Sequence, residues 1–320
     1  MERTDAPTRP LGSTGLEITR LGVGAWAIGG VGWRFGWGPQ DDNESIAAIN
    51  RAVQRGFNWI DTAPSYGWGH SEEIVGRAIE GLRPRPYVFT KAGAVEGAGQ
   101  AVVFRQDHRS IRREAEASLV RLGVDAIDLY QVHWPIPDED IEEGWAALSE
   151  LKDEGLVRHI GVSNFSVEQM RRISSIAPIE TIQPEYSLIE RTAEDDVLPY
   201  ARTHGMGIVV YSPMASGLLA GKLTRSRIEA LPADDWRTRH ERFRDPQLAL
   251  HLEMADRVRT VAERLTVAPG VVAIAWTLRN PAVDGAIVGL RRSDQVDELE
   301  EAATLELSGE DLAVLAGQSA

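Results

Sequence analysis

The chain has 320 residues and no cysteine. Disulfide bonds, thiol nucleophiles and cysteine metal sites are therefore excluded. Positive charge is also scarce: 34 Lys and Arg stand against 48 Asp and Glu, and the formal net charge is −14. This negative net charge argues against nucleic acids and anionic membranes as partners.

Long apolar runs are missing as well. No stretch of the sequence approaches the roughly 20 apolar residues of a membrane span. The first residues, Met1 to Asp5, lack the apolar core of a signal peptide. We therefore expect a soluble, cytoplasmic protein. The seven histidines include no His-x-His pair and no spacing typical of a ligand set, so no catalytic metal is expected.

What the sequence does contain is a regular alternation of short apolar runs and segments with helical spacing. In Asp42–Arg55, for example, Ile46, Ile49 and Val53 recur at a helical interval. The predicted strands are Leu21–Trp26, Phe57–Ile60, Tyr87–Thr90, Ile127–Val132, Val157–Val162, Thr181–Gln183, Ile208–Tyr211 and Ala286–Val288. The predicted helices are Asp42–Arg55, His70–Ile79, Arg109–Leu122, Ile141–Glu154, one beginning at Ser166, Asp195–Thr203, Gln247–Leu265, Gly270–Arg279, Asp294–Ala302 and Gly309–Ala316.

Such alternation implies a parallel sheet covered by helices. Eight strand–helix units in about 300 residues fit a closed (β/α)8 TIM barrel, with extra helices near the C-terminus. Turn residues between Leu11 and Ile18 predict a small N-terminal β-hairpin. A doubly wound open sheet is the alternative. No linker or break in composition divides the chain, so we expect one domain over residues 1–320.

One glycine pattern favours a different fold when it is considered alone. Gly22-Val23-Gly24-Ala25-Trp26-Ala27 matches G-x-G-x-x-A, which is typical of a Rossmann dinucleotide loop if a helix begins at once. Here Ile28-Gly29-Gly30-Val31-Gly32 follows, and this sequence is a poor helix former. The pattern therefore does not predict a Rossmann fold.

The stretch from Asn58 to Tyr66 is the one around which the chain is organised. Asp61 ends an apolar run, and a buried carboxylate is costly unless it is paired. Capping of the next helix is one explanation, but that helix is expected to begin only near His70. A functional role for Asp61, with Tyr66 beside it on the following loop, is the other.

Polar or aromatic residues stand at the C-terminal ends of nearly all the predicted strands. In a (β/α)8 barrel these ends form the active site. Adjacent strands lie about 4.8 Å apart, so Asp61, Lys91 and His133 can converge. The residues at the strand ends are Trp26, Asp61, Lys91, His133, Ser163, Asn164, Gln183, Tyr211, Ser212 and Gly289.

This convergence predicts acid catalysis by Tyr66. Asp61 would hold the ammonium of Lys91, and the nearby cation would lower the pKa of Tyr66 from about 10. Tyr66 would then serve as a general acid near neutral pH, and His133 could donate a hydrogen bond to a substrate oxygen. The alternatives are a solvated rim lysine at Lys91 and a structural histidine at His133.

Several short motifs occur in a familiar order from about Leu11 to Glu301. They are Asp61-Thr62-Ala63 with Tyr66, Gly67 and Ser71-Glu72; Thr90-Lys91; Val132-His133-Trp134; Gly161-Val162-Ser163-Asn164-Phe165; Gln183 with Tyr186-Ser187; Tyr211-Ser212-Pro213; and Ile287-Val288-Gly289. Together they resemble the aldo-keto reductase superfamily, and in particular its bacterial branch of general stress and sugar-type reductases.

The resemblance implies an NADPH-dependent reduction of aldehydes or ketones in a barrel without a Rossmann loop. Tyr66 would be the proton donor, Asp61 and Lys91 would tune it, and His133 would orient the carbonyl. The cofactor would stack its nicotinamide on Tyr211. The other residues implied in cofactor binding are Trp26, Asp61, Ser163, Asn164, Gln183, Ser212, Pro213, Met214, Gly217, Lys222, Gly289, Arg291, Gln295 and Glu298. We expect Trp33, Trp37, Trp68 and Trp134 to line the substrate mouth.

Two departures from the family pattern concern the adenosine end. Leu299 stands where the family often has asparagine, and Gln295 stands where some members have an arginine for the 2′-phosphate. Preference for NADPH over NADH then depends mainly on Arg291, with Arg292 beside it. The rival functions are a cofactor-binding regulatory protein with slow turnover and a dehydrogenase that works in the oxidative direction.

A long polar segment, Thr224 to Asp245, interrupts the strand–helix pattern. It is rich in arginine and aspartate and has few apolar residues. Long irregular loops in compact domains are usually functional or disordered. We expect this segment to be a mobile lid over the cofactor.

Overall fold

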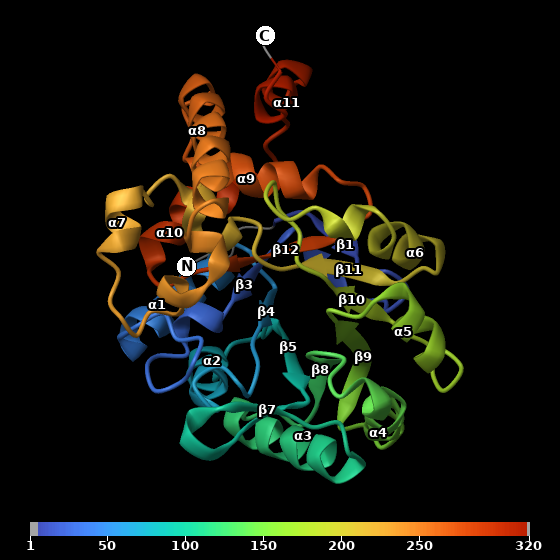
Figure 1. Ribbon diagram of the computed structural model, residues 1–320. Helices are drawn as coiled ribbons and strands as arrows, with labels where there is room; N and C mark the ends of the chain where they lie inside the picture. The colour runs from blue at the N-terminus through green and yellow to red at the C-terminus, as the bar shows by residue number, and fades with distance from the viewer. Residues whose placement is uncertain (1–5, 319–320) are drawn as a thin grey trace.

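The computed structural model describes residues 6–318. A closed ring of parallel strands forms its centre, in the order β10, β11, β12, β3, β4, β5, β8, β9 (Figure 1). The ring closes where β9 pairs with β10. Their bounds are β3 (Leu21–Gly24), β4 (Trp59–Asp61), β5 (Tyr87–Ala92), β8 (Ile127–Val132), β9 (Val157–Ser163), β10 (Thr181–Gln183), β11 (Gly207–Val210) and β12 (Gly285–Gly289). The prediction of a (β/α)8 barrel is confirmed, and the doubly wound alternative is wrong.

Helices surround this ring, and local sequence explains where several of them begin. Asp41 accepts hydrogen bonds from the backbone N–H groups of Asn43 and Glu44 and so caps α1. Ser166 forms a capping box with Gln169, which confirms the predicted start of α5. The helices are α1 (Asp42–Gln54), α2 (His70–Ile79), α3 (His108–Leu122), α4 (Ile141–Asp153), α5 (Val167–Ile173), α6 (Val197–Thr203), α7 (Arg225–Glu229), α8 (Gln247–Leu265), α9 (Pro269–Leu278), α10 (Ser293–Leu299) and α11 (Gly309–Leu315).

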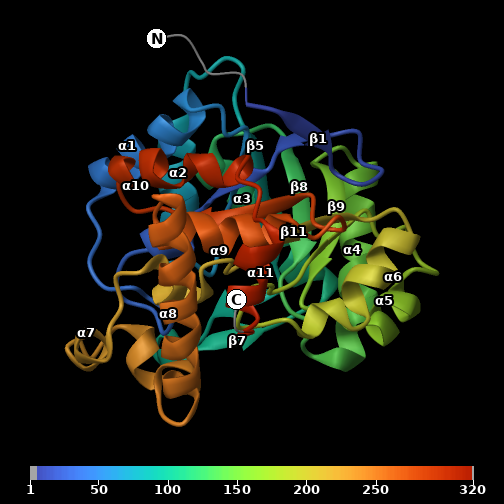
Figure 2. The same cartoon turned by 90° about the horizontal axis from the view of Figure 1, so that it is seen from above.

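The extra helices lie on one side of the molecule. Seen from above, α8, α9 and α10 gather away from α4, α5 and α6, and α11 lies against α8 (Figure 2). No single helix within residues 6–318 is long and apolar enough to cross a membrane; α8 and α9 meet that test only together, across a bend of 100°.

The inside of the barrel is packed with apolar side chains and is not a pore. Trp59, Phe89 and Leu129 form a buried cluster there with Val209 and Ile287. Two glycines make room for the largest of them: a Cβ on Gly22 would lie 2.2 Å from the Trp59 ring, and one on Gly285 would lie 2.9 Å from it. Glycine at these two positions leaves space for the Trp59 indole inside the barrel.

A β-hairpin closes the bottom of the barrel. Its strands are β1 (Thr8–Pro10) and β2 (Glu17–Thr19), which pair antiparallel. The predicted hairpin is confirmed, but it begins at Thr8 and not at Leu11. Leu11 lies in the turn and joins the cluster inside the barrel, fully buried, because apolar burial there outweighs strand pairing.

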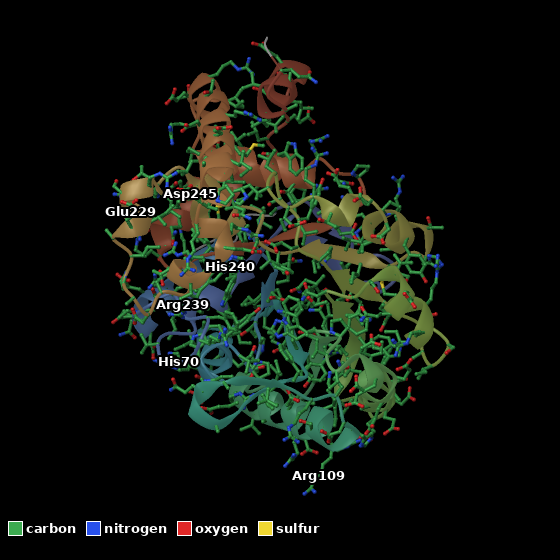
Figure 3. The ribbon with its side chains drawn as sticks, in the orientation of Figure 1. His70, Arg109, Glu229, Arg239, His240 and Asp245 are labelled. Carbon is green, nitrogen blue, oxygen red and sulfur yellow. The ribbon has the colours of Figure 1, made fainter. Side chains whose placement is uncertain are left out.

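Two segments differ from expectation. A second antiparallel pair, β6 (Ala94–Glu96) and β7 (Val102–Phe104), was not predicted. The segment 224–245 is not an irregular loop with few apolar anchors, because it contains α7 and two short 3-10 helices, Trp236–Arg239 and Glu241–Phe243. Ile228, Trp236 and Phe243 are buried. In Figure 3 this segment runs inward from Glu229 at the outer edge to His240 and back out to Asp245.

Candidate active site

Four polar side chains from the ends of β4, β5 and β8 meet at the mouth of the barrel. The Lys91 ammonium donates to Asp61 Oδ1 at 2.6 Å and to the Thr62 carbonyl at 3.0 Å. It also lies 3.4 Å from the Tyr66 hydroxyl. The His133 ring stands edge-on to the Tyr66 ring, with the ring centres 5.8 Å apart. The structure therefore brings these four predicted residues together.

The Asp61–Lys91 pair is almost completely buried. Burial raises the pKa of Asp61, and Lys91 opposes the rise. Burial lowers the pKa of Lys91, and Asp61 opposes the fall. Hydrogen bonds favour the ionised pair, since Gln183 Nε2 donates to Asp61 Oδ2 at 2.8 Å and each hydrogen of the ammonium has an acceptor.

The expected lowering of the pKa of Tyr66 is wrong in direction. Burial, and after it the Asp61 carboxylate, raises the pKa of Tyr66 well above 10. The reason is that removal from water, which disfavours the charged phenolate, is the larger effect. Tyr66 therefore keeps its proton at neutral pH. Burial and the Lys91 charge lower the pKa of His133 well below 6.5, so its ring is neutral and can donate one N–H.

The strand ends on the opposite side of the mouth form one hydrogen-bonded network. Ser163 Oγ donates to the Gln183 carbonyl at 2.8 Å. The Asn164 amide donates to Ser163 Oγ at 3.0 Å and to the His133 carbonyl at 3.0 Å. Tyr211 donates its hydroxyl to Asn164 Oδ1 at 2.8 Å. These bonds fix the orientation of the amide and phenol groups that the sequence assigned to nicotinamide binding.

The backbone after β11 makes a sharp turn through the left-handed region. Ser212, Ala215, Ser216 and Gly217 all have positive φ angles, between 47° and 93°. Backbone N–H groups in such curled segments form concave sites for anions such as phosphate. In this turn, however, the N–H groups of Ala215 and Gly217 donate to the carbonyls of Ser212 and Met214 at 2.8 and 3.0 Å. The Met214 sulfur lies against Gly270 of α9. Backbone hydrogen bonds of its own therefore hold the turn that the resemblance assigns to the pyrophosphate.

The residues expected at the adenosine end lie near α10 but are bound to other protein groups. Arg291 donates to Gln40 Oε1 at 2.6 Å and to the Pro39 carbonyl at 2.5 Å. Gln295 Oε1 accepts from the backbone N–H of Arg291 at 2.8 Å and from that of Arg292 at 3.0 Å, and the second bond caps α10. Lys222 pairs with Glu298 at 2.9 Å. Nothing lies within 4 Å of a Cβ built on Gly289, and Leu299 is buried in the core.

Aromatic rings surround Tyr66. The Trp26 and Trp33 ring centres lie 6.5 and 5.8 Å from it. Trp26 lies not on β3 but in a 3-10 turn after it, Trp26–Ile28. Trp37 packs edge-on against Trp26 at 5.4 Å, and the half-exposed Trp134 lies 6.3 Å from the His133 ring. Within the described residues, no ring contact joins Trp68 to this group.

Sequence reasoning missed one member of this aromatic group. Trp236, from the segment 224–245, lies 5.0 Å from Trp26 and 5.9 Å from Trp37. Neither Trp236 Nε1 nor Trp37 Nε1 has a hydrogen-bond acceptor among residues 6–318. Buried donors of this kind call for a partner. The signal that could have revealed Trp236 was a single large apolar residue within a polar segment.

A closed (β/α)8 barrel with a buried Asp–Lys pair, a neutral tyrosine and a neutral histidine at its mouth defines a class of NAD(P)H-dependent oxidoreductase. The chain belongs to the aldo/keto reductase family, whose model matches residues 20–318. Members of this family reduce carbonyl groups with nicotinamide cofactors.

Similar proteins support this assignment. The chain is 40% identical to the aldo-keto reductase YhdN of Bacillus subtilis over 94% of this chain and 90% of that protein. It is 34% identical to an NADH-specific methylglyoxal reductase of Escherichia coli over 96% of each. Among solved structures, a glycerol dehydrogenase from Gluconobacter oxydans superposes with a TM-score of 0.86 at 37% identity, over 97% of this chain and 94% of that one.

Proposed function

We propose that this protein uses NADPH to reduce small aldehydes or ketones to alcohols, with Tyr66 as the proton donor. The bound cofactor supplies the hydride. The observation that carries the proposal is the position of the Tyr66 hydroxyl, 3.4 Å from the Lys91 ammonium, with the His133 ring edge-on to the Tyr66 ring. Burial raises the pKa of Tyr66 and lowers the pKa of His133, which favours the neutral form of both. A group that is protonated at neutral pH and lies in a site shielded from water can act as a general acid.

Each residue of the mouth has a separate task. His133 donates its N–H to the substrate oxygen and so aligns the carbonyl with Tyr66. Lys91 stabilises the negative charge that develops on the phenol oxygen as the proton leaves, and Asp61 keeps Lys91 in place. Ser163, Asn164 and Gln183 would hold the carboxamide of the cofactor, Tyr211 would support its ring, and its pyrophosphate would lie along residues 212–217.

The substrate is a small carbonyl compound, bound between the indoles at the mouth. Trp26 and Trp33 flank Tyr66, and Trp134 stands at the rim beside His133. Indole faces pack well against short carbon chains and sugars. Two of the similar proteins act, by name, on the three-carbon compounds methylglyoxal and glycerol. Compounds of this size are therefore the first to test.

The test is steady-state oxidation of NADPH, and separately of NADH, with methylglyoxal, glyceraldehyde, aldoses and aromatic aldehydes. We expect sustained turnover with at least one of them. NADH must be included because the Escherichia coli relative is NADH-specific. Tight cofactor binding without sustained turnover on any carbonyl would contradict an enzymatic role and favour a cofactor-binding regulatory protein.

The oxidative direction is a second candidate, since one similar structure is a glycerol dehydrogenase. The ratio of carbonyl reduction to alcohol oxidation at pH 7 distinguishes the two directions. We expect reduction to be faster, because Tyr66 holds its proton at that pH and must lose it before it can accept one from an alcohol.

A further inference from the structure

The first turn of α2 contacts the ends of three neighbouring barrel strands. Ser71 and Glu72 in this turn are fully buried. Ser71 Oγ donates to the Ala25 carbonyl at 2.9 Å and lies 2.9 Å from Thr62 Oγ1. Glu72 Oε1 accepts a hydrogen bond from Thr90 Oγ1 at 2.6 Å. The turn therefore connects the segments after β3 and β4 with β5.

Each contact lies one residue from a member of the active site. Thr62 follows Asp61, and Thr90 precedes Lys91. Ser71 also holds the backbone of the catalytic loop, because its N–H donates to the Tyr66 carbonyl at 3.2 Å. Neither Ser71 nor Glu72 is close enough to Tyr66 OH or Lys91 Nζ to form a side-chain hydrogen bond with it. Both act on the site through the residues that they hold.

Burial of the Glu72 side chain costs free energy, because its carboxylate is removed from water. The carboxylate is paired with Arg121 of α3, whose Nε and Nη2 lie 2.7 and 2.6 Å from it. Room for Arg121 in turn requires a glycine at the N-cap of α2, since a Cβ on Gly69 would lie 2.7 Å from the arginine side chain. A buried ion pair contributes little net stability compared with apolar residues of the same size. Stability alone therefore does not explain Glu72.

The charge of Glu72 bears on Lys91. The charged and titratable groups around the lysine are Asp61 on β4, Tyr66 on the next loop, His133 after β8, and Glu72 on the outer side of β5. Among these, Asp61 and Glu72 raise the pKa of Lys91 against the effect of burial. Glu72 itself faces Arg121 and lies near Glu114 and Tyr130.

We propose that Glu72 is a positioning residue for the reduction, which holds the end of β5 and Lys91 in place through Thr90. This inference rests on the proposed function, because Lys91 and Tyr66 are taken as the groups that handle the proton.

The main test is Glu72→Gln, which keeps the shape of the side chain and the oxygen that accepts from Thr90. We expect kcat for the best carbonyl substrate to fall at least tenfold, while KM and the Kd of the cofactor change less than twofold. The basic limb of the kcat–pH profile should move to lower pH, because Lys91 loses one of the two carboxylates that keep it protonated.

A matched control is Glu114→Gln on α3. Glu114 is also a buried carboxylate behind β5, and it accepts from the backbone of Gly93 at 3.0 Å, but it is not among the groups that raise the pKa of Lys91. In this control we expect kcat to change less than twofold and the basic limb of the kcat–pH profile to stay at the same pH. Equal effects of Glu72→Gln and Glu114→Gln, or an unchanged kcat and pH profile in Glu72→Gln, would overturn the proposal.

Two further measurements keep the proposal testable. If Glu72→Gln fails to fold, Thr90→Val is the alternative, because it leaves the Glu72–Arg121 pair in place and removes only the link to β5. This variant should lower kcat with KM unchanged, and an unaltered kcat would count against the proposal.

NMR titration of 13Cε-labelled Lys91, assigned by Lys91→Met, needs no turnover. If the wild type is inactive but Glu72→Gln lowers the pKa of Lys91, the proposed function is refuted. The interaction between the charges of Glu72 and Lys91 is then still supported.

Discussion

The protonation state of Tyr66 follows from its burial. Burial, and after it the charge of Asp61, raises the pKa of the phenol well above 10 and keeps the proton on its oxygen. The Asp61 carboxylate is itself paired with the Lys91 ammonium at 2.6 Å. A protonated donor that needs no prior activation suits a reductase. The cation matters later, when charge develops on the phenol oxygen.

The first prediction at this scale concerns Tyr66→Phe. The ring stays packed between Trp26, Trp33 and His133, and only the hydroxyl is lost. Positioned proton transfer is typically worth ~10²–10⁴-fold, so kcat should fall by that factor. NADPH binding, followed by fluorescence titration, should change little. A loss below about fivefold with cofactor binding intact would mean that the proton comes from elsewhere, such as His133.

Arg291 carries the second prediction. Its guanidinium is the residue at the adenosine end best suited to a 2′-phosphate, through paired, charge-assisted hydrogen bonds. Arg291→Ala should weaken NADPH about tenfold or more and NADH much less, as measured by Kd. Arg109→Ala is the control, because Arg109 is an exposed arginine on α3, on another side of the molecule from α10 (Figure 3). If NADPH and NADH lose affinity equally in Arg291→Ala, Arg291 does not bind the phosphate.

At the scale of single residues, the sequence was informative about position and not about charge. Asp61, Lys91 and His133 could be predicted because each polar residue ends an apolar run in a barrel. The direction of the pKa shift of Tyr66 could not, because it depends on how deeply the fold buries the phenol. The contacts of Glu72 were hidden for a similar reason: an acidic residue in the first turn of a helix is ordinary.

Among the elements, α3 holds a buried group that titrates near neutral pH. Glu114 lies inside α3, and burial raises its pKa from 4.5 to about 7. The folded protein thus binds this proton more tightly than the unfolded chain does. The stability that this proton contributes is fully present below pH 4.5 and is lost as the pH rises through about 7.

Glu114→Gln removes this dependence. Between pH 4.5 and pH 8, the wild type should lose about 3 kcal/mol of unfolding free energy that the variant does not lose. Urea unfolding at the two pH values measures it. If the unfolding free energies of the variant and the wild type differ by the same amount at pH 4.5 and pH 8, Glu114 does not titrate in this range.

The segment 224–245 is the second element with a testable property. Trp236 anchors it to Trp26 and Trp37, and the Arg239 guanidinium donates to the Arg34 carbonyl at 2.8 Å. We propose that it covers the cofactor and opens when the cofactor leaves. Trypsin should cut at its arginines more slowly when NADPH is bound, and faster in Trp236→Ala than in Trp236→Phe. Equal cutting with and without NADPH would rule out a lid.

The element-level predictions succeeded where the chain repeats a pattern. All eight barrel strands were found from apolar runs, and their bounds differ by a few residues from those of the structure. The pair β6–β7 was missed because its short strands lie among Gly93, Gly97 and Gly99, which indicate turns. The 3-10 helices of 224–245 were missed because tertiary contacts of Trp236 and Phe243, and not local propensity, hold them.

For the molecule as a whole, the packing inside the ring is the property to test. A Cβ on Gly22 would lie 2.2 Å from the Trp59 ring, so Gly22→Ala overfills the barrel. Overpacking typically costs about 1–3 kcal/mol. Gly309→Ala is the control, because nothing lies within 4 Å of its added methyl group. Urea midpoints should fall only for Gly22→Ala, and Trp59→Phe in the same chain should restore part of the loss. Equal midpoints for the two variants would contradict this account.

The pairing of β12 with β3 also matters during synthesis. Leu21 on β3 pairs with Ala286 on β12, from the opposite end of the chain. At roughly 5–20 residues per second, a ribosome delivers β12 on the order of 10 to 50 seconds after β3. Until then the N–H and C=O groups along that edge of β3 have no partner strand, and an open edge can recruit other nascent chains. We therefore expect this enzyme to depend on chaperones between the start of its translation and its release.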